Sequence, residues 1–173
     1  MAITLYDVSV ASYLQVLGAV GGYLERGRQH LEAEGDDPDG VLGVRLFPDM
    51  MDFRFQVYQV THHSRGAIEG ARAGLFSPTG PGGPDTYAGL QTLIRETQAW
   101  LEALSADEVN GLEGRDMAFA FGERRMPFTV EGFLMSFSTP NLHFHATTAY
   151  DILRMKGVPL GKRDYMGRMR MKA

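Results

Sequence analysis

Four stretches of the chain repeat their apolar residues with the period of an α-helix, and this pattern limits the possible folds more than any other feature of the sequence. Each stretch has one apolar side, which must be buried against another element. Segments rich in glycine and proline at 35–40 and 77–85 separate the first three stretches. The sequence therefore predicts long amphipathic helices that pack together, over residues 5–34, 48–75, 85–104 and 129–156.

A few residues mark the expected boundaries of these helices. Asp85 is placed to cap the third helix, because an aspartate side chain accepts hydrogen bonds from the first free backbone N–H groups. Pro140 is expected to kink or break the last helix. A short helical turn is expected over 38–46, and the basic segment at about 160–173 is expected to be extended.

Residues 115–130 change to the two-residue period of a β-strand. Apolar residues alternate with small or polar ones from Met117 to Phe121 and again from Met126 to Val130, with Gly122 between the two runs. This pattern predicts a β-hairpin with one apolar face. The expected fold class is all-α, with one domain over 1–173 that forms a four-helix bundle and carries a small β-hairpin between its third and fourth helices.

Composition excludes several classes of protein. The chain has no cysteine, which rules out disulfides, thiolate nucleophiles and Cys-ligated zinc or iron–sulfur sites. A formal net charge of −4 argues against nucleic acid as a partner. No apolar run approaches the ~20 residues of a bilayer-spanning helix, and the N-terminus lacks the basic start of a signal peptide. We therefore expect a cytoplasmic protein that binds neither nucleic acid nor membrane.

Helical phase predicts which histidines face the core. In the last helix His145 lies in the middle of the apolar arc, Asn141 lies one turn away on the same side, and His143 points outward. In the second helix His63 borders the core, whereas His62 points outward. A polar pocket in the bundle core is therefore expected around His63, Asn141 and His145.

This set of residues supports two kinds of chemistry. Imidazoles on facing helices can hold a divalent metal such as zinc or nickel, so His63 and His145 are candidate metal ligands. Asn141 would be the third ligand, although an amide is a poor ligand for either ion. In acid–base chemistry His145 would act as the general acid or base and Asn141 would orient the substrate, which makes both candidate catalytic residues.

Structural roles could explain the same residues without any reaction. Asn141 would cap the helix that follows Pro140, and His63 would be a half-exposed residue at the edge of the core. His145 would be a buried imidazole bonded to one of the inward hydroxyls, those of Ser9, Ser12, Tyr13 and Tyr23. These alternatives stay open at this point.

The second helix also has an outward stripe of Met and aromatic residues. Either the 38–46 segment covers this stripe or a dimer interface does, because interface cores are rich in methionine and aromatic side chains. The stripe consists of Met51, Phe55, Tyr58 and His62.

Four segments of the chain resemble one family. They are Leu5–Asp7, Arg45–Met50, Pro140–Arg154 and Gly157–Tyr165. The span from the first segment to the last covers nearly the whole sequence. On these segments the chain is similar to the DUF1993 family, a domain-of-unknown-function family grouped with the DinB/YfiT-like metalloenzyme superfamily. The resemblance implies a four-helix bundle and a homodimer.

The resemblance also implies where a site would lie. Many DinB-like proteins bind a divalent metal through one His on the second helix and a His-x-x-x-His pair on the last, and some use the thiols bacillithiol, mycothiol or glutathione. The second-helix ligand falls on His63 or His62, and the pair falls on Asn141 and His145, so Asn141 departs from the pattern. The chain is thus expected to be a DinB-like protein, either a (metallo)enzyme or a non-enzymatic small-molecule-binding or stress-associated dimer with a degenerate metal site.

Overall fold

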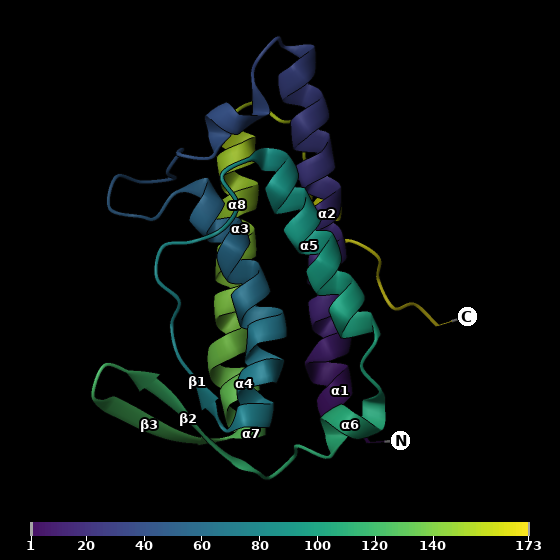
Figure 1. Ribbon diagram of the computed structural model, residues 1–173. Coiled ribbons are helices and arrows are strands. Elements are labelled where there is room, and N and C mark those ends of the chain that lie inside the picture. Colours follow the sequence, from purple (N-terminus) through teal and green to yellow (C-terminus); the bar gives the residue numbers. More distant parts are fainter. Residues whose placement is uncertain (1, 173) are drawn as a thin grey trace.

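The computed structural model describes residues 2–172 as a mostly helical protein, which confirms the mainly helical prediction (Figure 1). Two short helices, α1 (Leu5–Val8) and α6 (Ala106–Asn110), lie near the end of the molecule opposite the 3₁₀ turn η1 (Pro38–Val41). The long stretches are α2 (Val10–Ala33), α3–η2–α4 (Phe53–Thr61, His62–Gly66, Ala67–Ala73), α5 (Tyr87–Glu102) and α7–η3–α8 (Val130–Phe133, Leu134–Ser138, Thr139–Met155).

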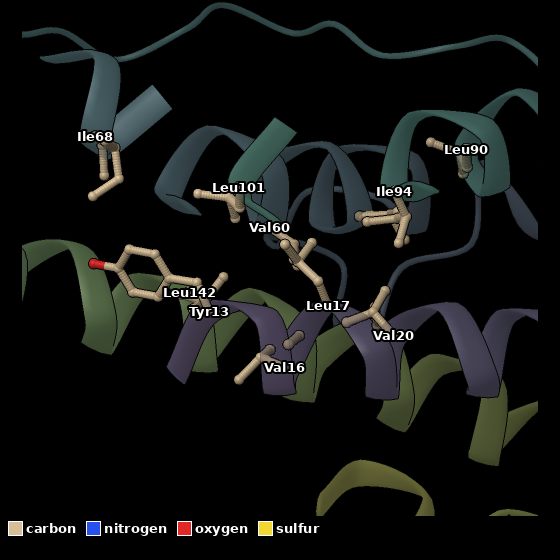
Figure 2. Packing of buried hydrophobic residues seen from close by; sticks show 14 of the residues in the cluster. Tyr13, Val16, Leu17, Val20, Val60, Ile68, Leu90, Ile94, Leu101 and Leu142 are labelled. Atoms are coloured by element: carbon tan, nitrogen blue, oxygen red, sulfur yellow. The ribbon is translucent and has the colours of Figure 1, made fainter. Parts of the chain in front are cut away.

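The long helices enclose one hydrophobic core. Both α2 and α3 pack against α5 and against α8, so the core lies between the four. Its largest fully buried side chains include Tyr13, Tyr23 and Phe53. Figure 2 shows aliphatic residues from α2, α3, α5 and α8 meeting in this space, among them Leu17, Val20, Val60, Ile94, Leu101 and Leu142. None of the helices formed by residues 2–172 combines the length and apolar character that crossing a membrane would require.

The β structure is larger than the predicted hairpin. In the described chain, β2 (Asp116–Phe121) pairs antiparallel with β3 (Arg124–Thr129), and a third strand, β1 (Leu75–Phe76), pairs parallel with β2 to give a mixed sheet. The second helix was expected to reach Leu75, but Gly74 adopts a left-handed conformation with φ 70° and ends α4. Leu75 and Phe76 thereby become extended and reach β2 near the end of the bundle (Figure 1).

Two helix starts differ from the prediction because other residues provide the caps. The second helix begins at Phe53, since the side chain of Asp52 accepts a hydrogen bond from the N–H of Phe55. The third helix is capped by Thr86 in place of Asp85, whose carboxylate instead forms an ion pair with Arg54. A few residues of shift at helix ends leave the buried faces unchanged.

Two π-helical turns interrupt the long helices, and the sequence pattern gave no sign of the first. η2 lies between α3 and α4, and η3 lies directly before α8, where Pro140 stands in the first turn. The expected break at Pro140 therefore takes the form of a π turn. The two turns are joined by a buried hydrogen bond of 2.9 Å, which the hydroxyl of Ser138 donates to the carbonyl oxygen of His63.

The C-terminal segment is folded against α2, which corrects the prediction of an extended tail. Lys162–Met166 form a short helix, α9, which packs on α2. The side chain of Gln15 donates a hydrogen bond to the carbonyl oxygen of Met166, and Arg26 pairs with Asp164. These polar contacts hold a segment whose sequence is mainly basic and glycine-rich.

Candidate functional site

The structure brings His63 and His145 together. His63 projects from the π turn η2 and His145 from α8, and their ring centroids lie 5.6 Å apart with an angle of 15° between the planes. Aromatic rings surround the pair, with Phe55 5.9 Å from His145 and with Phe76 and Phe137 5.5 and 5.9 Å from His63. We call these two imidazoles the histidine pair.

Gln56 fixes the orientation and the tautomer of His145. The amide nitrogen of Gln56, itself buried, donates to the carbonyl oxygen of Met51 at 2.9 Å, so its amide oxygen faces His145. This oxygen lies 2.7 Å from Nδ1 of His145 and can only accept, which assigns the proton to Nδ1. Nε2 of His145 therefore carries a free lone pair, the form in which a histidine acts as a base or binds a metal.

His63 lies deeper than His145 and has an unsatisfied ring nitrogen. Its exposed fraction is 5%, and its Nδ1 is the one buried side-chain nitrogen or oxygen without a hydrogen-bond partner within residues 2–172. Such groups are rare because each costs about 1–3 kcal/mol. Because this unpaired nitrogen lies beside a second imidazole, it is the strongest indication of a ligand-binding site at the histidine pair.

Both rings of the histidine pair are neutral at pH 7. Burial lowers the pKa of His63 to about 3, and the neighbouring imidazoles of His145 and His62 add to the shift. Burial, with a smaller contribution from the nearby His62, lowers the pKa of His145 to about 4. The pair thus offers hydrogen-bond acceptors rather than positive charge.

Asn141 does not join the histidine pair. Its side-chain nitrogen donates to the carbonyl oxygen of Phe137 at 2.7 Å, four residues earlier, and so supports the π turn η3. His143 is exposed, as expected, and its Nδ1 lies 3.1 Å from the hydroxyl of Tyr165. The hydroxyls of Ser9 and Tyr23 bond backbone carbonyls, so Gln56 is the partner of His145 in their place.

His62, which was predicted to point outward, is only partly exposed. Its ring stacks on Phe76 with a centroid distance of 4.4 Å, and its Nε2 lies 3.0 Å from the carbonyl oxygen of Ser77. The helical angles assumed one α-helix from Phe53 onward, but η2 widens the helix at His62 and changes the phase of the residues that follow.

The residues near the histidine pair do not make a site for zinc or nickel on their own. Zinc sites use at least three protein ligands, and Asn141, whose side-chain nitrogen donates to the carbonyl oxygen of Phe137, could offer only an amide oxygen, a poor ligand for zinc. His62 adds a third imidazole, 5.4 Å from His63, but within residues 2–172 no group of three or more His, Asp or Glu side chains could hold a metal ion. The histidine pair thus includes one imidazole that is oriented by an amide oxygen, but it supplies fewer ligand atoms than a zinc or nickel site needs.

Access to the histidine pair is from the side of His145. His145 is partly exposed, whereas His63 is covered. Exposed apolar side chains flank this side, including Phe144, whose ring lies 5.4 Å from that of His145, and Met51, whose carbonyl oxygen holds Gln56. Neither imidazole of the pair is among the residues that line five of the hollows in the described chain.

Known proteins share the family and the fold of this chain. A family model described as "Domain of unknown function (DUF1993)" matches residues 5–166. The crystal structure of a DinB family member protein from Shewanella denitrificans, at 1.83 Å resolution, is similar, with a TM-score of 0.81 and 26% sequence identity over 98% of this chain and 95% of that chain. Among proteins with curated descriptions, none matches this chain.

Proposed function

Because the chain belongs to the DUF1993 family and resembles a DinB family member along nearly its full length, we propose that it is a DinB-like four-helix-bundle enzyme that acts on a small molecule by acid–base chemistry. The histidine pair would be the reactive centre. The observation that carries this proposal is the 2.7 Å contact between Nδ1 of His145 and the amide oxygen of Gln56. A carbonyl-held imidazole with a free second nitrogen is the arrangement that general bases use.

The proposed step is a proton transfer between the substrate and His145. Nε2 of His145 accepts the proton, and the amide oxygen of Gln56 stabilises the resulting imidazolium through the Nδ1–H bond. The unpaired Nδ1 of His63 supplies a second polar group, which accepts or donates a hydrogen bond according to the tautomer of the ring. Because the apolar surroundings hold the pKa of His145 at about 4, an acidic substrate whose negative charge raises that pKa in the complex suits the site.

The substrate would need an apolar part beside its acidic group. Phe55 and Phe137 lie close to the histidine pair, and Phe144 and Met51 flank its open side. Aromatic and methionine side chains form contacts with apolar groups of ligands, whereas the two imidazoles provide the few polar contacts that fix orientation. This division matches a small molecule with one acidic hydrogen and a hydrocarbon portion.

Exposed apolar side chains beside the site support a homodimer as part of the proposal. Met51 and Phe144 expose 38% and 54% of their surface, and neither belongs to the core cluster. Clusters of this kind are often covered by a second chain in solution. Light scattering of the purified protein measures the mass, and a monomer at micromolar concentration would remove this part of the proposal.

A second candidate is binding without turnover, as in a DinB-like protein with a degenerate metal site. It is supported by the side-chain nitrogen of Asn141, which donates to the carbonyl oxygen of Phe137, since within residues 2–172 no hydrogen bond joins Asn141 to either imidazole. Both candidates use the histidine pair, and they differ in whether a bound molecule is converted. His145→Asn distinguishes them, because it would abolish turnover in the first case and only weaken binding in the second.

The test combines nitrogen NMR of the imidazoles with a screen of small acidic molecules. We expect His145 to give the Nδ1–H tautomer, and at least one acid with an apolar part to shift the His145 and His63 signals saturably, with the shifts lost in His145→Asn. Elemental analysis and melting with added zinc or nickel complete the experiment. Stoichiometric metal that is lost in His145→Asn would overturn the acid–base proposal in favour of a metalloenzyme.

A further inference from the structure

A polar hollow beside the π turn η2 is lined by residues that include neither ring of the histidine pair. Its volume is about 260 Å³, and it is bounded by α3, η2 and α4 on one side and by Leu93 and Thr97 of α5 on the other. His62, Arg65 and Glu69 line it from one face of the helix, because residues three, four and seven positions apart share a face. We call it the His62 hollow, and it is separate from the histidine pair.

His62 presents a free acceptor to this hollow. Its Nε2 lies 3.0 Å from the carbonyl oxygen of Ser77, which can only accept, so Nε2 carries the proton and Nδ1 has the lone pair. Nδ1 lies over Gly66, where an added Cβ atom would come within 2.9 Å of it. Gly66 also lines the hollow, so the missing side chain is what leaves this nitrogen accessible.

Arg65 is held in a fixed orientation with its terminal amino groups available. Its Nε donates to Glu69 at 2.8 Å, and its guanidinium carbon lies 5.1 Å from the ring centroid of Trp100. Within residues 2–172 its terminal amino groups make no hydrogen bond with another side chain or with the backbone. Two parallel N–H donors of this kind match a carboxylate.

We propose that the His62 hollow binds a small hydroxycarboxylate. The carboxylate would accept two hydrogen bonds from the terminal amino groups of Arg65, and the hydroxyl would donate to Nδ1 of His62. The hydroxyl groups of Thr61 and Thr97, which also line the hollow, add further polar contacts. The volume suits a ligand of only a few heavy atoms, smaller than the drug-sized molecules that fill cavities of about 300–1,000 Å³.

The test is an NMR titration of the full chain with L-lactate as the probe. Propanoate, which lacks the hydroxyl, and propane-1,2-diol, which lacks the carboxylate, are the matched controls. We expect saturable shifts of His62, Gly66 and Thr97 with millimolar lactate, several-fold weaker binding of propanoate, and no binding of the diol. Absence of saturation by lactate, or equal binding of lactate and propanoate, would overturn the proposal.

Substitutions distinguish binding in the hollow from general effects on the surface. Arg65→Gln is expected to weaken lactate binding by about tenfold or more, because it removes the charged donors. Arg72→Gln is the matched control, since Arg72 also lies over Trp100, at 5.3 Å, and also pairs with a glutamate, but does not line the hollow. Equal losses in both variants would mean that Trp100 packing, not the hollow, is responsible.

Gly66→Ala tests the role of Nδ1 of His62 as a hydrogen-bond acceptor, and it does so without straining the backbone at residue 66. Gly66 has helical dihedral angles, φ −58° and ψ −33°, so alanine fits the backbone, while its methyl group crowds Nδ1 of His62. We expect a small fall in melting temperature, because the ring of His62 must shift, together with at least tenfold weaker lactate binding, and unchanged binding would contradict the assignment of His62. His145→Asn should leave lactate binding intact, so this inference and the acid–base proposal can fail independently.

Discussion

His145 owes its tautomer to an uncharged neighbour, so removing that neighbour should change the ring without changing its burial. In Gln56→Leu, Nδ1 of His145 and the carbonyl oxygen of Met51 lose their partners, and we expect a loss of about 1–3 kcal/mol in the free energy of unfolding. Nitrogen NMR should show a mixture of His145 tautomers. Gln59→Leu is the control, because Gln59 is equally buried on α3 but bonds Thr79. An unchanged tautomer in Gln56→Leu would contradict the orienting role.

The neutral histidine pair predicts that stability falls in mild acid. The pKa values of His63 and His145 are lowered to about 3 and about 4, whereas a histidine in the unfolded chain titrates near 6.5. Below about pH 6.5 the unfolded chain therefore binds more protons, so the free energy of unfolding should drop by up to about 1.4 kcal/mol per pH unit for each ring. The free energy of unfolding should stop falling once His63 and His145 are protonated in the folded protein as well.

Urea unfolding between about pH 7 and about pH 5 measures this slope. His63→Phe removes one of the buried imidazoles and keeps an aromatic ring beside Phe76 and Phe137, so the slope should become smaller, and the lowered pKa values of His145, His62 and His143 should keep part of it. If His63→Phe retained the full slope, acid sensitivity would come from other groups.

At the scale of elements, the two π turns form one unit, and Ser138 joins them. In Ser138→Ala the carbonyl oxygen of His63 loses a buried hydrogen bond, which should cost about 1–3 kcal/mol. Amide exchange should become faster in both η2 and η3, because each turn supports the other. Ser136→Ala is the control, since Ser136 is exposed and bonds Gly132 within its own helical stretch. Faster exchange in one turn alone would refute this coupling.

The same elements mark how far the sequence could predict the site. Apolar periodicity placed His63 and His145 toward the same interior, because both lie on helices whose phase is set by large buried residues. It did not predict η2, because one α-helical period was applied through residues 62–66, and it did not predict the packing of His62 on Phe76, which comes from a separate strand. Gln56 was also missed as a partner, because a contact between α3 and α8 depends on packing and not on phase.

At the scale of the whole molecule, long-range contacts turn weak local preferences into structure. The strand Leu75–Phe76 exists only because β2 lies beside it, and the C-terminal segment is ordered because α2 provides partners for it. Neither partner is near in sequence, so local patterns could not predict them. The main helices could be predicted, since each carries its own amphipathic pattern over many residues.

Whether the C-terminal segment is part of the cooperative fold can be tested at Gly167. This residue has φ +59°, and a Cβ atom there would lie 3.1 Å from both the Cβ of Ala19 and the carbonyl oxygen of Gln15. Gly122 has almost the same φ, +58°, but open space around it. Gly122→Ala therefore measures the cost of a positive φ without a clash, about 1 kcal/mol, and Gly167→Ala adds the clash with α2 and the strain of a ψ of −147°, which falls in a region open almost only to glycine.

We expect Gly167→Ala to lower the melting temperature more than Gly122→Ala does and to expose the segment to trypsin, which cleaves after Arg168 and Arg170. Detachment would also free the hydroxyl of Tyr165 from His143 and Gln15 from Met166. Equal melting temperatures and equal resistance to trypsin would mean that the segment lies on α2 without contributing to stability. A larger effect at Gly167 would make α9 a structural part of the domain, because its loss would then weaken the packing of α2 that supports the core.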